Sequence, residues 1–228
     1  MTDYYNEFTR HLMNDIKPSV YFEELKNKKE FPLSEPFGVL LELEKIDQEL
    51  KHHPEGNVWN HTMQVVDQAA SRKEESINPE GFMWAALLHD IGKITTTRRR
   101  HGWITAYNHD KAGAEMTEDF LGKCNIDRNS EFFKYVVYMV RLHMQILFVV
   151  KNNEFVDYNL IMKSGYYNDI ALLGICDRLG RGLKSKEDIQ KEYDNIRIFK
   201  ERCKAYEDRM RRIQEKYMAN EKINKKYK

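Results

Sequence analysis

The sequence predicts an all-helical protein, on three observations. Apolar residues recur at helical spacing through nearly the whole chain. The 5 prolines and 11 glycines fall mostly between these periodic segments, where they separate helices rather than interrupt them. No sustained alternation of apolar and polar residues, which would indicate a half-buried strand, is present.

Helices are expected in ten segments along the chain. The fifth opens with Asn78-Pro79, a capping residue followed by proline at the first helical position. A loop of Thr and Arg residues is expected after that helix. The last helix begins at Ser185, where Ser185 and Asp188 resemble a capping box. The expected segments are 3–14, 19–28, 36–50, 57–74, 79–90, 109–123, 130–144, 157–164, 167–179 and the helix from Ser185 onward.

The last helix carries one long apolar stripe. Nine apolar residues recur there at steps of three or four, so we expect other protein surface to cover them. The stripe can pack on the body of the same chain, which is the simpler expectation, or on a second copy to give a homodimer. The nine residues are Ile189, Tyr193, Ile196, Phe199, Cys203, Tyr206, Met210, Ile213 and Tyr217.

Composition and charge set limits on the class of protein. The 228 residues suit one large domain or a domain with an appendage. Residues 181–228 hold 16 Lys and Arg against 9 Asp and Glu, which indicates either an anionic partner or a solvated helix. No stretch approaches the ~20 apolar residues of a membrane span. Without a secretory signal or a disulfide pattern in its 3 cysteines, we expect a cytoplasmic protein.

Residues of the types that bind metal ions recur within apolar helices. His89 and Asp90 end one apolar run, and Asp177 and His143 each follow another. His61 lies in a helix between inward-facing valines. Buried imidazole and carboxylate groups are costly without partners, and both are good ligands for divalent ions. Each residue alone is more often a satisfied core or capping group, but together they favour a shared metal site.

The order of these residues resembles the HD-domain metal-dependent phosphohydrolases. His61, then His89-Asp90, then Asp177 match the H…HD…D signature of that family. The sequence is most similar to the HD domain of bacterial tRNA nucleotidyltransferases. The glycine-rich motif of the transferase domain of those enzymes is missing from this sequence, so we expect a freestanding HD domain and no CCA addition. The matching pieces are 53–62, 87–93, 108–114 and 177–181.

The resemblance implies an HD-domain helical bundle that binds one or two divalent ions, with Asp90 bridging them in the two-ion case. The ion is left open among Mn, Fe, Co, Ni, Mg and Zn. Three segments are expected: an N-terminal helical extension packed on the core over 1–50, the HD core over 51–182, and a basic amphipathic helix over 183–228. The expected ligands are His61, His89, Asp90, His109, His143 and Asp177.

The expected reaction is the attack of metal-activated water on the phosphorus of a phosphoester. Asp90 and Lys93 are the expected catalytic residues, because a fixed cation beside the ions stabilises negative charge in the transition state. Lys93 has an alternative role as a basic residue near a helix C-terminus. Substrate contacts are expected from Lys93, Arg181, His53 and Arg99, although the arginines of that loop can equally be solvated.

The resemblance suggests that the substrates are 2′,3′-cyclic or 2′-phosphates on nucleotides or RNA ends. One alternative is a 5′-nucleotidase or deoxynucleoside triphosphate phosphohydrolase. Another is a non-catalytic scaffold that binds nucleic acid or protein through its C-terminal helix. The motifs GxxxxGKS/T, GxGxxG, HExxH and GxSxG are missing from the sequence, which argues against ATP-driven hydrolysis, dinucleotide chemistry and serine acyl transfer.

Overall fold

The computed structural model describes the backbone of residues 3–182 and 185–226, and side chains as far as Met218. Over these residues the chain forms eleven α-helices, two 3-10 helices and one two-stranded sheet, which confirms the predicted all-helical class. Residues 1–2, 183–184 and 227–228, which belong to the predicted segments 1–50 and 183–228, lie outside the described residues.

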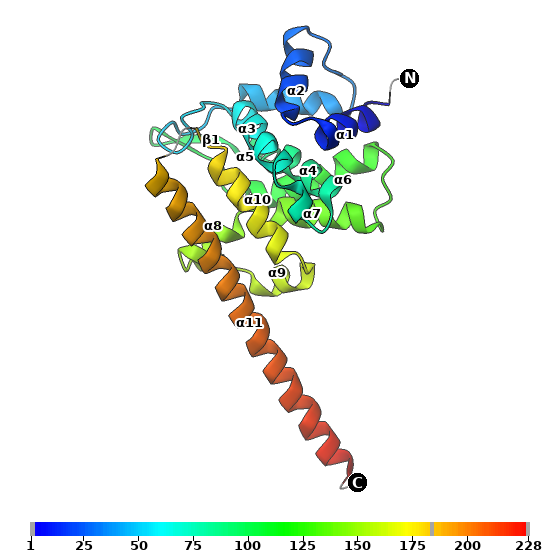
Figure 1. The fold of residues 1–228 in the computed structure, drawn as a ribbon, viewed down its shortest axis with the longest axis vertical. Coiled ribbons are helices and arrows are strands. Elements are labelled where there is room, and N and C mark those ends of the chain that lie inside the picture. Colours follow the sequence, from blue (N-terminus) through cyan, green and yellow to red (C-terminus); the bar gives the residue numbers. More distant parts are fainter. Residues whose placement is uncertain (1–2, 183–184, 227–228) are drawn as a thin grey trace.

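The elements follow one another with short connections (Figure 1). In chain order they are α1 (Tyr4–Asn14), α2 (Pro18–Asn27), the 3-10 helix η1 (Phe37–Lys45), α3 (Val58–Ala70), the 3-10 helix η2 (Lys73–Glu75), α4 (Pro79–Leu88), α5 (Lys93–Thr96), β1 (Arg98–Arg100), β2 (Trp103–Thr105), α6 (His109–Lys123), α7 (Glu131–Leu142), α8 (Gln145–Val150), α9 (Tyr158–Ser164), α10 (Tyr167–Leu179) and α11 (Lys186–Lys226).

Two predicted helices, 109–123 and 167–179, coincide with α6 and α10. The prediction for 36–50 was wrong in type and length, since the helix there is the 3-10 helix η1. It ends at Lys45 because the chain then becomes extended and Asp47 pairs with Asn57. The short helix α8 was not predicted as a separate element, because its apolar residues continue the pattern of α7.

α4 forms the centre of the bundle. It begins at Asn78, whose side chain accepts a hydrogen bond from the Gly81 backbone N–H at 3.0 Å, the usual arrangement of a helix cap. Its residues from Gly81 to Leu88 are all buried, as expected for a helix that is apolar all round. Helices α1, α3 and α7 pack against it. On the α1 side the Tyr5 and Trp84 rings stack with centroids 4.9 Å apart.

Gly92 brings the backbones of two segments into contact. A Cβ placed on Gly92 would lie 2.1 Å from the His109 carbonyl oxygen and 2.4 Å from the Gly113 nitrogen. Both atoms belong to the backbone of the first turns of α6, which cannot move aside as a side chain can. Gly92 therefore allows the segment after α4 to lie directly on the start of α6.

The segment between α5 and α6 is a β-hairpin and not the predicted loop. Its strands pair antiparallel, with Arg98 opposite Thr105 and Arg100 opposite Trp103. The two turn residues, His101 and Gly102, both have positive φ (49° and 82°), as a two-residue turn of type I′ requires. The sequence pattern did not predict the hairpin because each strand has only three residues, too few to establish an alternation.

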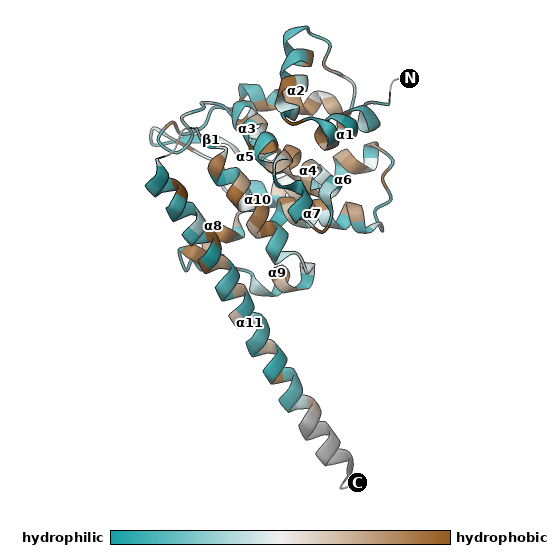
Figure 2. Ribbon diagram, viewed as in Figure 1, coloured by the Kyte–Doolittle hydropathy of each residue, from teal (hydrophilic) through white to brown (hydrophobic). Residues whose placement is uncertain are grey.

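α11 packs on α8, α9 and α10 over its first half and then projects beyond the body (Figures 1 and 2). Its 41 residues correspond to a length of about 60 Å. Phe199 and Cys203 are fully buried, but Met210, Ile213 and Tyr217 are exposed. The body of a single chain therefore does not cover the whole stripe, and the expectation of packing on the same chain was wrong for its last part. The body ends near Tyr206, which stacks on Tyr158.

Among the described residues, no helix combines the length and the apolar character that crossing a membrane takes.

Candidate metal centre and its pocket

The structure brings the six predicted ligands together from five helices. His61 lies within α3 and Asp177 within α10, while His109 is the first residue of α6. His89 and His143 are the residues that immediately follow the last turns of α4 and α7. All six side chains are buried.

Three of the four histidines are oriented in the same local way. The Nδ1–H of His89 donates to the Ala86 carbonyl at 2.9 Å, and that of His143 donates to the Val140 carbonyl at 2.7 Å. His109 makes the corresponding bond to Ala106 at 2.7 Å. Each partner lies three residues earlier, so the helix ends and the preceding turn fix the rings. These bonds assign the neutral tautomer whose lone pair is on Nε2.

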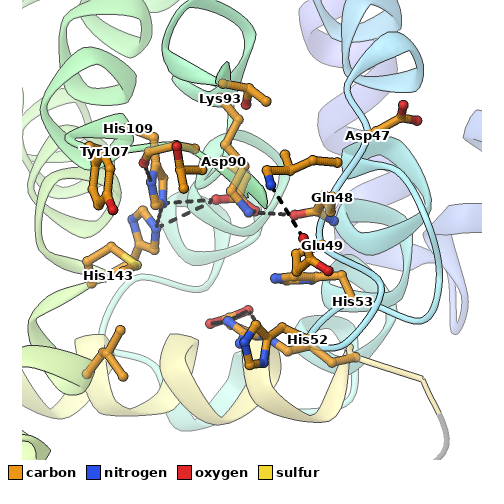
Figure 3. A pocket seen from close by; sticks show the side chains of 18 of the residues that line it. Asp47, Gln48, Glu49, His52, His53, Asp90, Lys93, Tyr107, His109 and His143 are labelled. Atoms are coloured by element: carbon orange, nitrogen blue, oxygen red, sulfur yellow. Dashed lines mark hydrogen bonds and ion pairs between the residues drawn. The ribbon is translucent and has the colours of Figure 1, made fainter. Parts of the chain in front are cut away.

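The four Nε2 atoms converge in two pairs. His61 Nε2 and His89 Nε2 lie 3.4 Å apart, and His109 Nε2 and His143 Nε2 lie 3.0 Å apart. Asp90 lies between the pairs, and Figure 3 shows it beside His109 and His143. Its Oδ2 is 3.3 Å from His89 Nε2 and 3.7 Å from His61 Nε2. Its Oδ1 is 3.3 Å from His109 Nε2 and 3.7 Å from His143 Nε2.

This donor set fits two divalent ions. Two lone pairs that face each other in a buried site repel unless a cation lies between them. Donors about 2.1 Å from one ion stand about 3.0 Å apart in octahedral and 3.4 Å apart in tetrahedral coordination, close to the observed spacings. The groups His61–His89–Asp90 and Asp90–His109–His143 each have donor atoms within 4.8 Å of one another.

The electrostatics of the centre favour neutral His109 and His143 and an ionised Asp90. Burial lowers the pKa of His143 to about 3 and also lowers that of His109. Burial opposes ionisation of Asp90, but the positive charge of Lys93 acts against it, and the Asp90 pKa is held well below its usual range. For His61, burial acts downward, but hydrogen bonds to Asp177 and Glu55 raise the pKa. An ion that binds His61 would therefore displace a proton from it.

Asp177 is held by Arg181 as well as by the histidine cluster. Its Oδ1 lies 3.0 Å from His61 Nε2. Arg181 donates to both carboxylate oxygens through Nη2, at 2.8 and 2.7 Å, and to Oδ1 through Nε at 3.1 Å. This fork geometry orients the carboxylate and stabilises its charge. Arg181 thus touches a predicted ligand and also lines the pocket.

Lys93 contacts the Asp90 carboxylate directly. Its Nζ lies 2.7 Å from Asp90 Oδ2 and donates to Gln48 Oε1 at 2.6 Å. The sequence analysis missed Gln48, which is buried in the segment before α3. Nothing in the local sequence marks this glutamine, because its role depends on a contact across 45 residues.

Glu55 is a second residue that the sequence analysis did not select. Its Oε1 accepts from His53 Nδ1 at 2.8 Å and from His61 Nδ1 at 2.9 Å. Burial opposes ionisation of Glu55, but these two hydrogen bonds outweigh it and lower the Glu55 pKa to about 2. Glu55 thereby directs His61 Nε2 towards Asp90 and holds His53 at the pocket wall. A carboxylate between two histidines, six residues before a candidate ligand, was the available signal.

Replacing Glu55 with Gln is expected to weaken metal binding by about 10–100-fold, the usual effect of losing an outer-shell partner of a ligand histidine. The glutamine amide would face His61 with either its N–H group or its carbonyl oxygen, which is a weaker acceptor than a carboxylate. In both cases the hydrogen bond from His61 Nδ1 is weakened or lost. Metal titration followed by calorimetry measures the change. Glu42→Gln, at an exposed position paired with Lys45, is the matched control, and equal metal affinity in all three proteins would contradict this role for Glu55.

A pocket of about 440 Å³ opens above the centre, within the range of small-molecule sites. Figure 3 shows Tyr107, His109 and His143 on one side of it, and Gln48, Glu49, His52 and His53 on the other. Ile104, Met144 and Leu147 contribute apolar wall. Four of the five predicted catalytic and substrate-contact residues line this pocket, namely Asp90, Lys93, His53 and Arg181. Arg99 does not: it is exposed on β1, opposite Ile104.

The fold and the site define a class of protein: a helical bundle with a buried histidine–aspartate centre of metal-ligand type. Residues 58–157 match the family model of the HD domain. The chain therefore contains an HD domain, and this confirms the resemblance on which the sequence analysis relied.

Curated relatives are multifunctional CCA proteins. That of Haemophilus influenzae (strain PittGG) is 26% identical over 201 residues, covering 82% of this chain and 46% of the relative. That of Actinobacillus pleuropneumoniae serotype 5b is 28% identical over 129 residues, 55% of this chain and 30% of the relative. That of Pseudomonas fluorescens (strain Pf-5) is 32% identical over 117 residues, 49% and 25% respectively. The chain spans less than half the length of these relatives.

Proposed function

We propose that this protein is a metal-dependent phosphohydrolase that cleaves phosphoesters of nucleotides or RNA ends, of the 2′,3′-cyclic phosphodiesterase, 2′-nucleotidase or phosphatase type. The observation that carries the proposal is the pair of histidine Nε2 clusters joined by Asp90 beneath an open pocket. Divalent ions bound there would lower the pKa of coordinated water from 15.7 towards ~7 and polarise a phosphoryl oxygen.

The residues of this chain have separate roles in the proposed reaction. One ion would be held by His61, His89, Asp90 and Asp177. The second would be held by Asp90, His109 and His143. Lys93 Nζ, 2.7 Å from Asp90 Oδ2, supplies a fixed cation where negative charge develops on the phosphate. Arg181 keeps Asp177 ionised and oriented.

The residues on both sides of the pocket support a nucleotide as the substrate. His53 donates its Nδ1 proton to Glu55, which leaves Nε2 free to accept a hydrogen bond from a ribose hydroxyl. Tyr107, Met144 and Leu147 offer an apolar and aromatic surface on which a base can lie. The similarity to multifunctional CCA proteins supports a phosphate at an RNA end.

A panel of substrates tests the proposal. Protein prepared without chelator is expected to cleave 2′,3′-cyclic and 2′-nucleotides in the presence of Mn, Co, Ni or Mg, and to lose this activity in EDTA. Cleavage restricted to 5′-nucleotides or deoxynucleoside triphosphates would favour the alternative nucleotidase. If elemental analysis found no bound metal and no added metal produced activity, the proposal would fail in favour of a non-catalytic scaffold.

The exposed end of α11 supports a homodimer as a further part of the proposal. Met210, Ile213 and Tyr217 continue the stripe that Phe199 and Cys203 bury against the body, and their spacing is that of paired helices. A second copy packed there would cover them.

The cellular location is a separate part of the proposal. The three free thiols Cys124, Cys176 and Cys203 support a reducing compartment such as the cytoplasm.

A further inference from the structure

The β1–β2 hairpin stands at the mouth of the pocket with one part inside it and one part in solvent. Ile104 and Thr105 of β2, and Tyr107 just after it, line the pocket. The backbone N–H of Ile104 points to Glu49 Oε2 at 3.4 Å, which places this edge of the hairpin against the opposite wall. The residues of the hairpin that lie outside the pocket and are exposed are Arg98, Arg99, Arg100, His101, Gly102 and Trp103.

Trp103 is exposed without any structural partner. It is 55% exposed, whereas Trp59 and Trp84 are fully buried. Trp59 and Trp84 also donate hydrogen bonds from their indole nitrogens. For the described part of the chain, no hydrogen bond or ring contact of the Trp103 side chain is recorded. The exposed indole ring is therefore available to stack on a nucleic-acid base.

Arg100 of this hairpin is a neighbour of two aromatic residues. Arg100 is the cross-strand neighbour of Trp103, so the two side chains share one face of the ribbon. The Arg100 guanidinium also lies 5.6 Å from the centre of the Tyr107 ring. Tyr107 lines the pocket, whereas Arg100 and Trp103 lie outside it. Alternating aromatic rings and arginines are the usual components of a surface that binds single-stranded nucleic acid.

We propose that this hairpin, residues 98–105, is a docking surface for the single-stranded 3′ end of an RNA whose last nucleotide occupies the pocket. The part concerning the terminal phosphate rests on the proposed function. The pocket volume of about 440 Å³ suits one nucleotide, so Trp103 and the arginines beyond it lie where the preceding nucleotides would pass. Trp103 stacks on a base, and Arg98 and Arg100 contact backbone phosphates.

Comparison of a mononucleotide with a short RNA tests the docking surface. The probes are adenosine 2′,3′-cyclic phosphate and a single-stranded octanucleotide that ends in a 2′,3′-cyclic phosphate. We expect wild-type kcat/KM to be at least about tenfold higher for the octanucleotide, the effect of one stacked base. The double variant Trp103→Ala/Arg100→Ala is expected to lose this advantage. The matched control is Phe155→Ala/Arg128→Ala, which also removes one aromatic ring and one arginine at exposed positions, outside the pocket and outside α11.

Binding gives a readout that does not depend on hydrolysis. Fluorescence anisotropy of a labelled octanucleotide measures its dissociation constant in EDTA, where hydrolysis is prevented. We expect this constant to rise about tenfold in the hairpin variant and to stay unchanged in the control. Octanucleotide binding that is equal in wild type and hairpin variant would overturn the docking surface, even if the mononucleotide is cleaved. Hairpin-dependent binding without cleavage of either probe would instead support the surface and count against the proposed function.

Discussion

Asp90→Asn is expected to abolish metal-dependent hydrolysis, with a loss of about a thousandfold or more in kcat/KM. The Asp90 carboxylate approaches both histidine pairs, one oxygen on each side. The amide nitrogen on one side has no lone pair to donate to an ion, so at least one ion would be lost together with the several kcal/mol of transition-state stabilisation that it supplies. Steady-state kinetics on the best substrate of the panel, with metal content measured in parallel, checks this.

The substitution in Asp90→Asn is nearly isosteric, so circular dichroism should show an unchanged fold. Asp67→Asn serves as the matched control, because the Asp67 carboxylate lies in α3 like His61 but bonds only to Ser19, in α2. The assignment would be wrong if Asp90→Asn kept more than a tenth of wild-type activity, or if the Asp67 variant lost as much.

His143→Asn is expected to reduce the metal content from two ions per chain to one. His143 Nε2 approaches His109 Nε2 and Asp90 Oδ1 but lies outside the His61–His89 pair. Its loss therefore removes a donor from one ion position only. Activity should fall by at least the 10–100-fold that follows from losing an outer-shell partner. Metal analysis after dialysis and kinetics with saturating metal measure the two effects.

Two variants complete this comparison. His61→Asn removes a donor from the other pair and is expected to leave the His109–His143 position able to bind. His11→Asn, whose imidazole stacks on Tyr21 far along the chain from the centre, should keep both ions. If the wild type held one ion and His143→Asn left the activity unchanged, the enzyme would use a single ion. That result would refute the two-ion arrangement.

The sequence predicted most of the candidate centre because five of the six expected ligands are polar residues within or at the end of apolar helices. The resemblance alone supplied the sixth, His109. His89 and His143 both follow buried runs, and such positions carry a high desolvation cost that demands a partner. The resemblance to HD domains supplied the grouping of these scattered positions. Helix boundaries followed from capping residues such as Asn78 and Ser185, whose side chains bond locally and so act through neighbouring residues alone.

Other features depend on contacts that no local pattern encodes. Glu55 and Gln48 act on His61 and Lys93 through the closed loop that the Asp47–Asn57 pairing forms. The hairpin strands are too short for a periodic signal. The apolar stripe of α11 continues unchanged past the point where the body ends, so periodicity predicts its face but not the length over which that face is covered.

The close contact at Gly92 has a consequence for the selection of ions. Gly92 lies two residues after Asp90, and its backbone rests on the His109 carbonyl and on Gly113. The bridging carboxylate and the second histidine pair are therefore joined through main-chain atoms rather than through long, adjustable side chains. Such a rigid connection fixes the gap between the two coordination positions, so cations of unequal radius should be distinguished by the polypeptide itself.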